Sequence, residues 1–217
     1  SGFYVARLAF MKKETLIATL GCEPDAHRGA VNIPVYRAST ILFPNFAAFE
    51  EAERGQAAYS AYGRVGTPST EALEKAIAGI EGADYSIVTS SGVSAIATAL
   101  MAFLQSGDHL LMADSVYGPT RRLCELELKR LGIETTYYDP LIGEGISALI
   151  RENTKVVFVE SPGSHTFEVQ DIPAISKAAH ARGVVVIGDN TWATPLFIKP
   201  FDLWGEHLLH TSTLIKV

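Results

Sequence analysis

Hydrophobic and polar positions follow two alternating spacings from about residue 69 onward. Apolar residues three and four apart predict helices over 70–80, 91–104, 119–131 and 172–181. Short apolar runs between them predict strands over 85–89, 109–113, 134–138, 155–160, a run ending at 189, and 207–212. This alternation indicates an α/β domain with a mostly parallel sheet flanked by helices.

Residues 11–68 lack this periodicity. They carry turn signals at Pro34, Pro44 and Pro68, and only the stretch 46–53 has helical character. We therefore expect an extended amino-terminal arm over 11–68 with one short helix, followed by the α/β domain over 69–217. A long arm with few elements often docks on another subunit. Residues 1–10 precede Met11, which resembles a natural start, and are interpreted as added or upstream residues.

Composition narrows the class of protein. The 217 residues are 47% hydrophobic, enough for a substantial core, and the net charge of −6 with no Lys/Arg run longer than two argues against nucleic acid. No apolar stretch approaches the roughly 20 residues that cross a membrane. Cys22 and Cys124 match no metal or redox spacing, so we expect no metal site and a reduced, cytoplasmic setting.

Asp189 is the most informative single position. It closes the apolar run 183–188 and opens the turn-rich segment 190–195. This pattern predicts a buried parallel strand that carries a carboxylate at its carboxyl end, where open α/β sheets bind ligands. A buried acid is costly unless it is paired, and a cationic ring nitrogen on a cofactor would be one such partner. The alternative is an aspartate that caps the following turn.

Two further segments carry groups suited to phosphate. Residues 90–95, Ser-Ser-Gly-Val-Ser-Ala, join a strand to a helix, and the amides of a first helical turn favour an anion. Tyr62 and Arg64 lie two apart in a Gly-rich loop and could both donate to phosphate. An ordinary capped helix and a solvated loop are the alternatives. A nucleotide site is disfavoured, because the sequence has neither a Walker loop nor GxGxxG.

Two more strand ends bring chemistry to the same edge of the predicted sheet. Tyr117 follows the strand 109–113, and its ring could stack on a flat ligand, although a core tyrosine is the alternative. The segment Glu160-Ser161-Pro162-Gly163-Ser164 follows the strand 155–160. Together the strand ends offer an anion site, an aromatic plane and a buried acid.

These segments resemble a known family. Residues 61–64, 90–95, 114–118, 160–162 and 189–195 are similar to the amino-terminal part of the Cys/Met-metabolism enzymes that use pyridoxal 5′-phosphate. The resemblance implies an aspartate-aminotransferase-like (fold type I) large domain, with the carboxyl-terminal domain of the family absent. The segment 160–164 and Trp192 favour the cystathionine β-lyase branch. The cystathionine γ-synthase, γ-lyase and methionine γ-lyase branch is the alternative.

The resemblance also implies a role for each site residue. The residues implied to bind the cofactor are Tyr62, Arg64, Gly92, Val93, Tyr117, Asp189, Thr211 and Thr213. Asp189 would pair with the ring nitrogen and Tyr117 would stack on the ring, whereas the main-chain amides at 92–93 and the two threonines would hold the phosphate. Tyr62 and Arg64 would reach the phosphate of a neighbouring subunit, which implies a homotetramer.

The implied reaction is α,β-elimination of cystathionine to homocysteine, pyruvate and ammonia, a step of trans-sulfuration and methionine biosynthesis. Tyr62 and Tyr117 are implied to be catalytic, together with a lysine directly after the element 211–213. Leu214 occupies that position, and Lys216 lies two residues later. We therefore interpret the chain as an incomplete or altered lyase with impaired activity. Use of Lys216 in a rearranged terminus, or a non-catalytic fragment that binds pyridoxal phosphate, are the alternatives.

Overall fold

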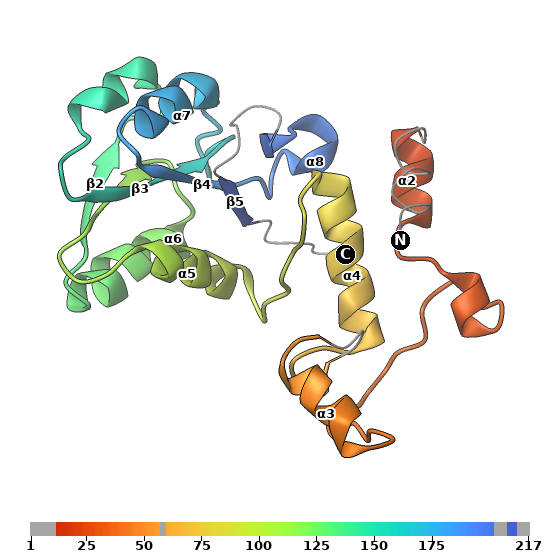
Figure 1. Ribbon diagram of the computed structural model, residues 1–217. Coiled ribbons are helices and arrows are strands. Elements are labelled where there is room, and N and C mark those ends of the chain that lie inside the picture. The colour runs from red at the N-terminus through yellow and green to blue at the C-terminus, as the bar shows by residue number, and fades with distance from the viewer. Residues whose placement is uncertain (1–11, 57–59, 202–207, 212–217) are drawn as a thin grey trace. The chain divides into compact units, whose positions relative to one another are not determined.

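The computed structural model describes residues 12–56, 60–201 and 208–211 (Figure 1). The chain divides into two compact units, residues 1–88 and residues 89–217. The sequence pattern predicts an α/β domain that starts at residue 69, whereas the helix over 68–81 groups with the amino-terminal unit. Among the described residues, none of the helices is both long and apolar enough to span a membrane.

The amino-terminal unit is built from short helices. They are α2 (Lys13–Thr19), the 3₁₀ helix η1 (Pro24–His27), α3 (Phe46–Glu53) and α4 (Pro68–Glu81). The helix expected at 46–53 is confirmed, but α2 shows that the expectation of a single helix in the arm was wrong. Thr67 caps α4 in a capping box with Thr70. Proline suits the first helical position, and Gly82 ends the helix at φ 79°.

The strand expected over 85–89 is absent from the structure. This stretch forms no ladder with any described residue, and the side chains of Tyr85 and Ile87 are 76% exposed. Glu74 of α4 holds the segment instead, because its Oε1 accepts the Val88 N–H at 3.1 Å and its carbonyl accepts the Ser86 hydroxyl at 2.8 Å. The prediction failed because β-branched residues favour extended backbone, whereas a strand also needs a neighbour.

The carboxyl-terminal unit contains a parallel sheet, as the alternating pattern predicted. Its strands are β1 (His109–Ala113), β2 (Glu134–Tyr138), β3 (Thr154–Glu160), β4 (Val185–Asp189) and β5 (Leu208–Thr211). They lie in the order β2-β1-β3-β4-β5, and every pair is parallel. The register places Glu160 opposite Asp189 and Asp189 opposite Thr211. The last residues of three neighbouring strands therefore meet at one edge.

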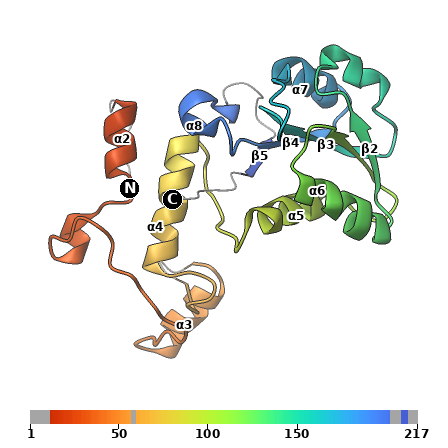
Figure 2. The same ribbon diagram turned by 180° about the vertical axis from the view of Figure 1, so that it is seen from behind.

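Helices cover both faces of this sheet (Figures 1 and 2). One face carries α5 (Gly92–Phe103), α6 (Gly118–Arg122) and η2 (Leu123–Leu128), and the other carries the 3₁₀ helix η3 (Gly143–Ala148) and α7 (Ile172–His180). Val156 and Phe158 pack in the hydrophobic core under α5 and η2, and Val157 and Val159 pack in the core under η3 and α7. Both faces of β3 are thus buried, which explains its unbroken apolar run. The short helix α8 (Thr194–Phe197) follows β4.

The helix predicted over 119–131 is interrupted by a change of geometry. After α6, η2 takes π-helical hydrogen bonding before ordinary helix resumes at Lys129. The apolar periodicity predicted the helix but not its π-helical segment. One extra residue per hydrogen-bonded turn shifts the buried face only slightly, so the apolar spacing changes little. Cys124 in η2 is buried, and burial raises the pKa of its thiol to about 11, so it is unsuited to act as a nucleophile.

His109 sits in a polar network at the amino end of β1. Its side chain is fully buried, with Nδ1 2.8 Å from Thr154 Oγ1 and Nε2 2.9 Å from Thr136 Oγ1. Arg151 binds Thr136 Oγ1 and also the Glu134 carboxylate, at 3.1 and 2.6 Å. Burial, and then the positive charge of Arg151, lower the pKa of the imidazole below 6.5. The network therefore holds a neutral histidine.

We expect this histidine to make the fold sensitive to mild acid. The pKa of His109 is lower in the folded chain, so at mildly acidic pH the unfolded chain binds one more proton. The stability that the neutral His109 contributes is therefore present above pH 6.5 and is lost as the pH falls from 6.5 towards the folded pKa. Urea unfolding between about pH 7 and pH 5 should show a loss of up to about 1.4 kcal/mol per pH unit from this group. His109→Gln should flatten the slope, whereas His27→Gln in η1 should keep it. An equal slope in His109→Gln would contradict the prediction.

Candidate functional site

Asp189 is buried at the carboxyl edge of the sheet. It ends β4, its side chain is 7% exposed, and Oδ1 accepts the Thr191 N–H at 2.9 Å. The expected buried acid and the alternative turn cap therefore both hold for the same side chain. The local bond fixes the direction of the carboxylate. Its position suits a cationic partner at this edge.

Glu160 is a site residue to which the sequence pattern assigned no role of its own beyond its place in the segment 160–164. It ends β3 beside Asp189, it is 8% exposed, and its Oε2 accepts the Tyr117 N–H at 2.9 Å. Burial raises its pKa to about 7, and the neighbouring Asp189 carboxylate adds to the rise. The available signal was the one used for Asp189, an acid that closes a buried apolar run.

Tyr117 presents its ring outside the core. The side chain is 47% exposed, so the alternative of a core tyrosine was wrong. The loop before it is held by Arg121, which donates to the Asp114 carbonyl at 2.7 Å, pairs with the Asp114 carboxylate and lies 3.9 Å above the centre of the Tyr137 ring. A rigid loop with an exposed ring is suited to stacking on a flat ligand.

The first turn of α5 supplies main-chain donors. The Ser91 side chain caps the helix by accepting the Ser94 N–H at 3.2 Å. Within the described ranges, no acceptor is assigned to the amides of Gly92 and Val93. Because α5 leads into the amino end of β1, its first turn lies towards the carboxyl edge of the sheet (Figure 1). These amides are suited to an anion at that edge.

The remaining candidates fall elsewhere in the chain. The backbone of Thr211 pairs with Asp189 in β5. Thr213, Leu214 and Lys216 lie outside the described residues, so the structure does not address their predicted roles.

Tyr62 and Arg64 belong to the amino-terminal unit, and the candidates described above belong to residues 89–217. Ser39 Oγ donates to the Tyr62 hydroxyl at 3.0 Å, and the Arg64 guanidinium lies 5.6 Å from the centre of the Tyr62 ring. Both side chains are exposed. The structure therefore brings this pair together as one exposed donor group.

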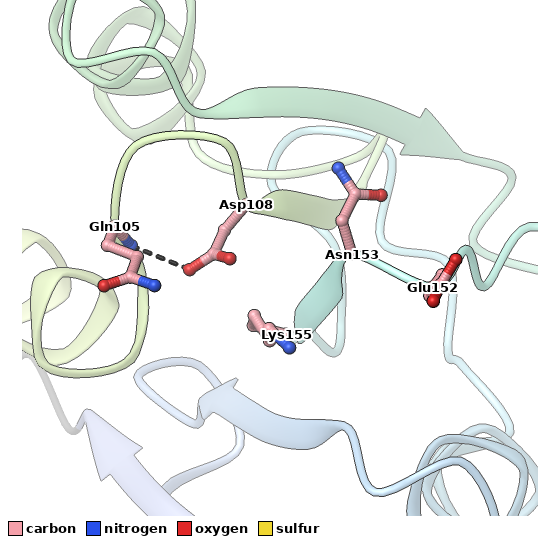
Figure 3. A pocket seen from close by; sticks show the side chains of 5 residues that line it. All are labelled: Gln105, Asp108, Glu152, Asn153 and Lys155. Carbon is pink, nitrogen blue, oxygen red and sulfur yellow. Dashed lines mark hydrogen bonds between the residues drawn. The ribbon is translucent and has the colours of Figure 1, made fainter.

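The cavity drawn in Figure 3 lies at the opposite edge of the sheet. It has a volume of about 480 Å³ and is lined by Gln105, Asp108, Glu152, Asn153 and Lys155. These residues precede or begin β1 and β3, whereas Glu160 and Asp189 end β3 and β4. Asp108 Oδ2 already accepts the Gln105 N–H at 2.8 Å. In the part of the chain that the structure describes, no cluster of acids, histidines and cysteines could hold a metal.

Comparison with known proteins identifies the family. The sequence pattern of the family described as Cys/Met metabolism PLP-dependent enzyme matches residues 14–213. The chain belongs to this family. PLP is pyridoxal 5′-phosphate, so the expected family and its cofactor are confirmed.

Individual relatives carry different reaction names. A Rhizobium johnstonii protein provisionally named a cystathionine beta-lyase is 48% identical over 92% of this chain and 49% of its own length. The L-alanine/L-glutamate racemase of Wolbachia pipientis is 37% identical over 94% of this chain and 52% of its own. The crystal structure of cystathionine gamma-lyase from Lactobacillus plantarum matches with a TM-score of 0.82 and 35% identity, over 92% of this chain and 50% of that one. The chain thus spans about half the length of these relatives.

The residues at the carboxyl edge fit the cofactor of the family. Pyridoxal phosphate has an anionic phosphate, a flat ring and a ring nitrogen that becomes cationic on protonation. The first amides of α5 suit the phosphate, the exposed Tyr117 ring suits the flat ring, and the buried Asp189 carboxylate suits the cation. Glu160 beside Asp189 adds a second acid to the same edge.

Proposed function

We propose that this chain provides the cofactor-binding half of a pyridoxal-phosphate-dependent carbon–sulfur lyase. The observation that supports this most directly is the buried Asp189 carboxylate at the carboxyl end of β4, beside Glu160, which binds the exposed Tyr117 loop. When bound, the cofactor supplies an electron sink for the substrate α-carbon. Asp189 would keep the ring nitrogen protonated, Tyr117 would orient the ring, and Gly92 and Val93 would hold the phosphate.

The substrate that we propose is cystathionine, cleaved by α,β-elimination to homocysteine, pyruvate and ammonia. The β-lyase name of the Rhizobium relative and the segment 160–164 with Trp192 support this branch. The rings of Phe167 and Trp192 lie 5.2 Å apart, so these two residues join the loops after β3 and β4. The γ-lyase structure favours γ-elimination as a second candidate. The product separates the two, because γ-elimination of cystathionine releases 2-oxobutyrate instead of pyruvate.

We further propose that the chain assembles with copies of itself. The arm exposes large apolar side chains, with Leu42 88% exposed, Val35 76% and Phe46 72%. Apolar surface of this kind is typical of segments that dock on another chain. The exposed pair Tyr62 and Arg64 would then donate to the phosphate in a neighbouring subunit. A tetramer is the assembly that the family resemblance implies.

A titration of the purified chain tests the proposal. Pyridoxal phosphate should bind with a change in its absorbance and circular dichroism, and pyridoxal, which lacks the phosphate, should bind at least about tenfold more weakly. Adenosine monophosphate serves as the control for a general phosphate site and should not compete. Equal binding of pyridoxal and its phosphate, or no binding of either, would contradict the proposed site.

The lysine position is tested on the same protein. With Leu214 where the family has its cofactor-linking lysine, we expect no pyruvate from cystathionine and no label at position 214 after borohydride reduction and peptide mapping. Label on the Lys216 peptide would assign the linking role to that residue. In Leu214→Lys, borohydride should attach the cofactor at position 214. Pyruvate release by the unaltered chain would contradict the expected impairment.

A further inference from the structure

Glu160 connects the two parts of the proposed cofactor site. Its carboxyl group lies between Asp189, its partner in the neighbouring strand, and Tyr117, which follows β1. Its Oε2 accepts the Tyr117 N–H at 2.9 Å across 43 residues of sequence. The N–H of Tyr117 precedes the first turn of α6, so it has no acceptor within that helix.

Gln170 binds the main chain at Glu160 and the side chain of Ser161. Gln170 Nε2 donates to the Glu160 carbonyl at 2.7 Å, and the Gln170 N–H donates to Ser161 Oγ at 3.0 Å. The Tyr138 hydroxyl donates to Gln170 Oε1 at 2.9 Å. All four residues are buried. A connected buried network of this kind restricts motion, so the Glu160 carboxyl is presented from a fixed base.

The ring of Tyr117 depends on its own backbone for its position. Because the side chain is 47% exposed, core packing does not fix it. The Tyr117 carbonyl is held by the N–H groups of Thr120 and Arg121, at 2.9 and 3.1 Å, and its amide is held by Glu160. Loss of the Glu160 acceptor would free one side of the residue and leave a part-buried N–H unpaired.

We propose that Glu160 is a positioning residue, whose carboxyl oxygen fixes the Tyr117 backbone and so sets the ring beside Asp189 for the cofactor. This rests on the proposed pyridoxal phosphate site and adds a residue to it. The acceptor oxygen carries the role, and the negative charge does not. Burial beside Asp189, which raises the pKa of Glu160 to about 7, agrees with a group that works without its charge.

Two neutral substitutions separate the acceptor from the charge. Glu160→Gln keeps an oxygen that can accept the Tyr117 N–H, and Glu160→Met fills the same space without an acceptor. In titrations of the full chain with pyridoxal phosphate, Glu160→Met should bind about tenfold more weakly and lose most of the induced circular dichroism. Glu160→Gln should stay within about threefold of the unaltered chain. Glu152→Ala, at the opposite end of β3, is the matched control and should bind normally.

A cofactor-free measurement keeps the test independent of binding. Hydrogen exchange at the Tyr117 amide should be faster in Glu160→Met than in Glu160→Gln, and melting temperatures check that both variants fold. The inference is overturned if Glu160→Met binds as well as the unaltered chain, or if Glu160→Gln is as weak as Glu160→Met. Failure of the unaltered chain to bind pyridoxal phosphate would instead overturn the proposed function. The proposed role of Glu160 would then fall as well.

Discussion

Replacing Asp189 with asparagine should weaken the binding of pyridoxal phosphate by about 10- to 100-fold, the loss of a hydrogen bond to a charged group. Asparagine keeps the shape of the side chain and an oxygen that can accept the Thr191 N–H, so the fold should persist. What it removes is the negative charge that would hold the ring nitrogen protonated. The measurement is an equilibrium titration followed by absorbance, with a melting curve for each protein.

The chain offers a close control for this substitution. Asp139 directly follows β2, and its Oδ1 accepts the Leu141 N–H at 2.8 Å, the same local turn that Asp189 forms with Thr191. Asp139 is exposed, and it follows the last residue of β2, which is an outer strand of the sheet. Asp139→Asn should therefore bind the cofactor like the unaltered chain. Equal affinity in Asp189→Asn and Asp139→Asn would remove Asp189 from the site.

Gly163→Ala should lower the free energy of unfolding by about 1–3 kcal/mol, the usual cost of overpacking. A Cβ at this buried position would lie 2.5 Å from Ser115 Oγ and 2.6 Å from Ser115 Cβ. Ser115 cannot easily move, because its carbonyl accepts the Ser164 N–H at 2.8 Å. The clash would push apart the loops after β1 and β3, so cofactor binding through Tyr117 should weaken as well.

Gly118→Ala is the control for this prediction. It lies after β1, like Ser115, at the first position of α6, and a Cβ there would meet no atom within 4 Å. Urea unfolding should show little change or a small gain, since alanine restricts the unfolded chain more than glycine does. A similar loss of stability in both variants would mean that the contact with Ser115 does not determine the effect.

Local patterns predicted the bounds of several elements. Strands β1 and β2 and helix α3 have the predicted bounds, because β1 is a buried apolar run, β2 is rich in residues that favour strands, and Asn45 caps the start of α3. The prediction over 85–89 failed because it required a partner strand that the described residues do not provide. Tyr117 was left between two interpretations, since an aromatic side chain after a strand suits both a core and a rim.

The sequence by itself determined the α/β class, the acid at the end of β4 and the family, because each depends on residue types at short, regular spacings. The tertiary structure alone decided that Glu160 receives the Tyr117 amide and lies beside Asp189. Those contacts join residues far apart in sequence, and they depend on strand order and register, which no local pattern specifies. Asp189, which the sequence singled out, is thus one of several linked residues at the carboxyl edge of the sheet. Glu160, a second buried acid, lies between Asp189 and Tyr117.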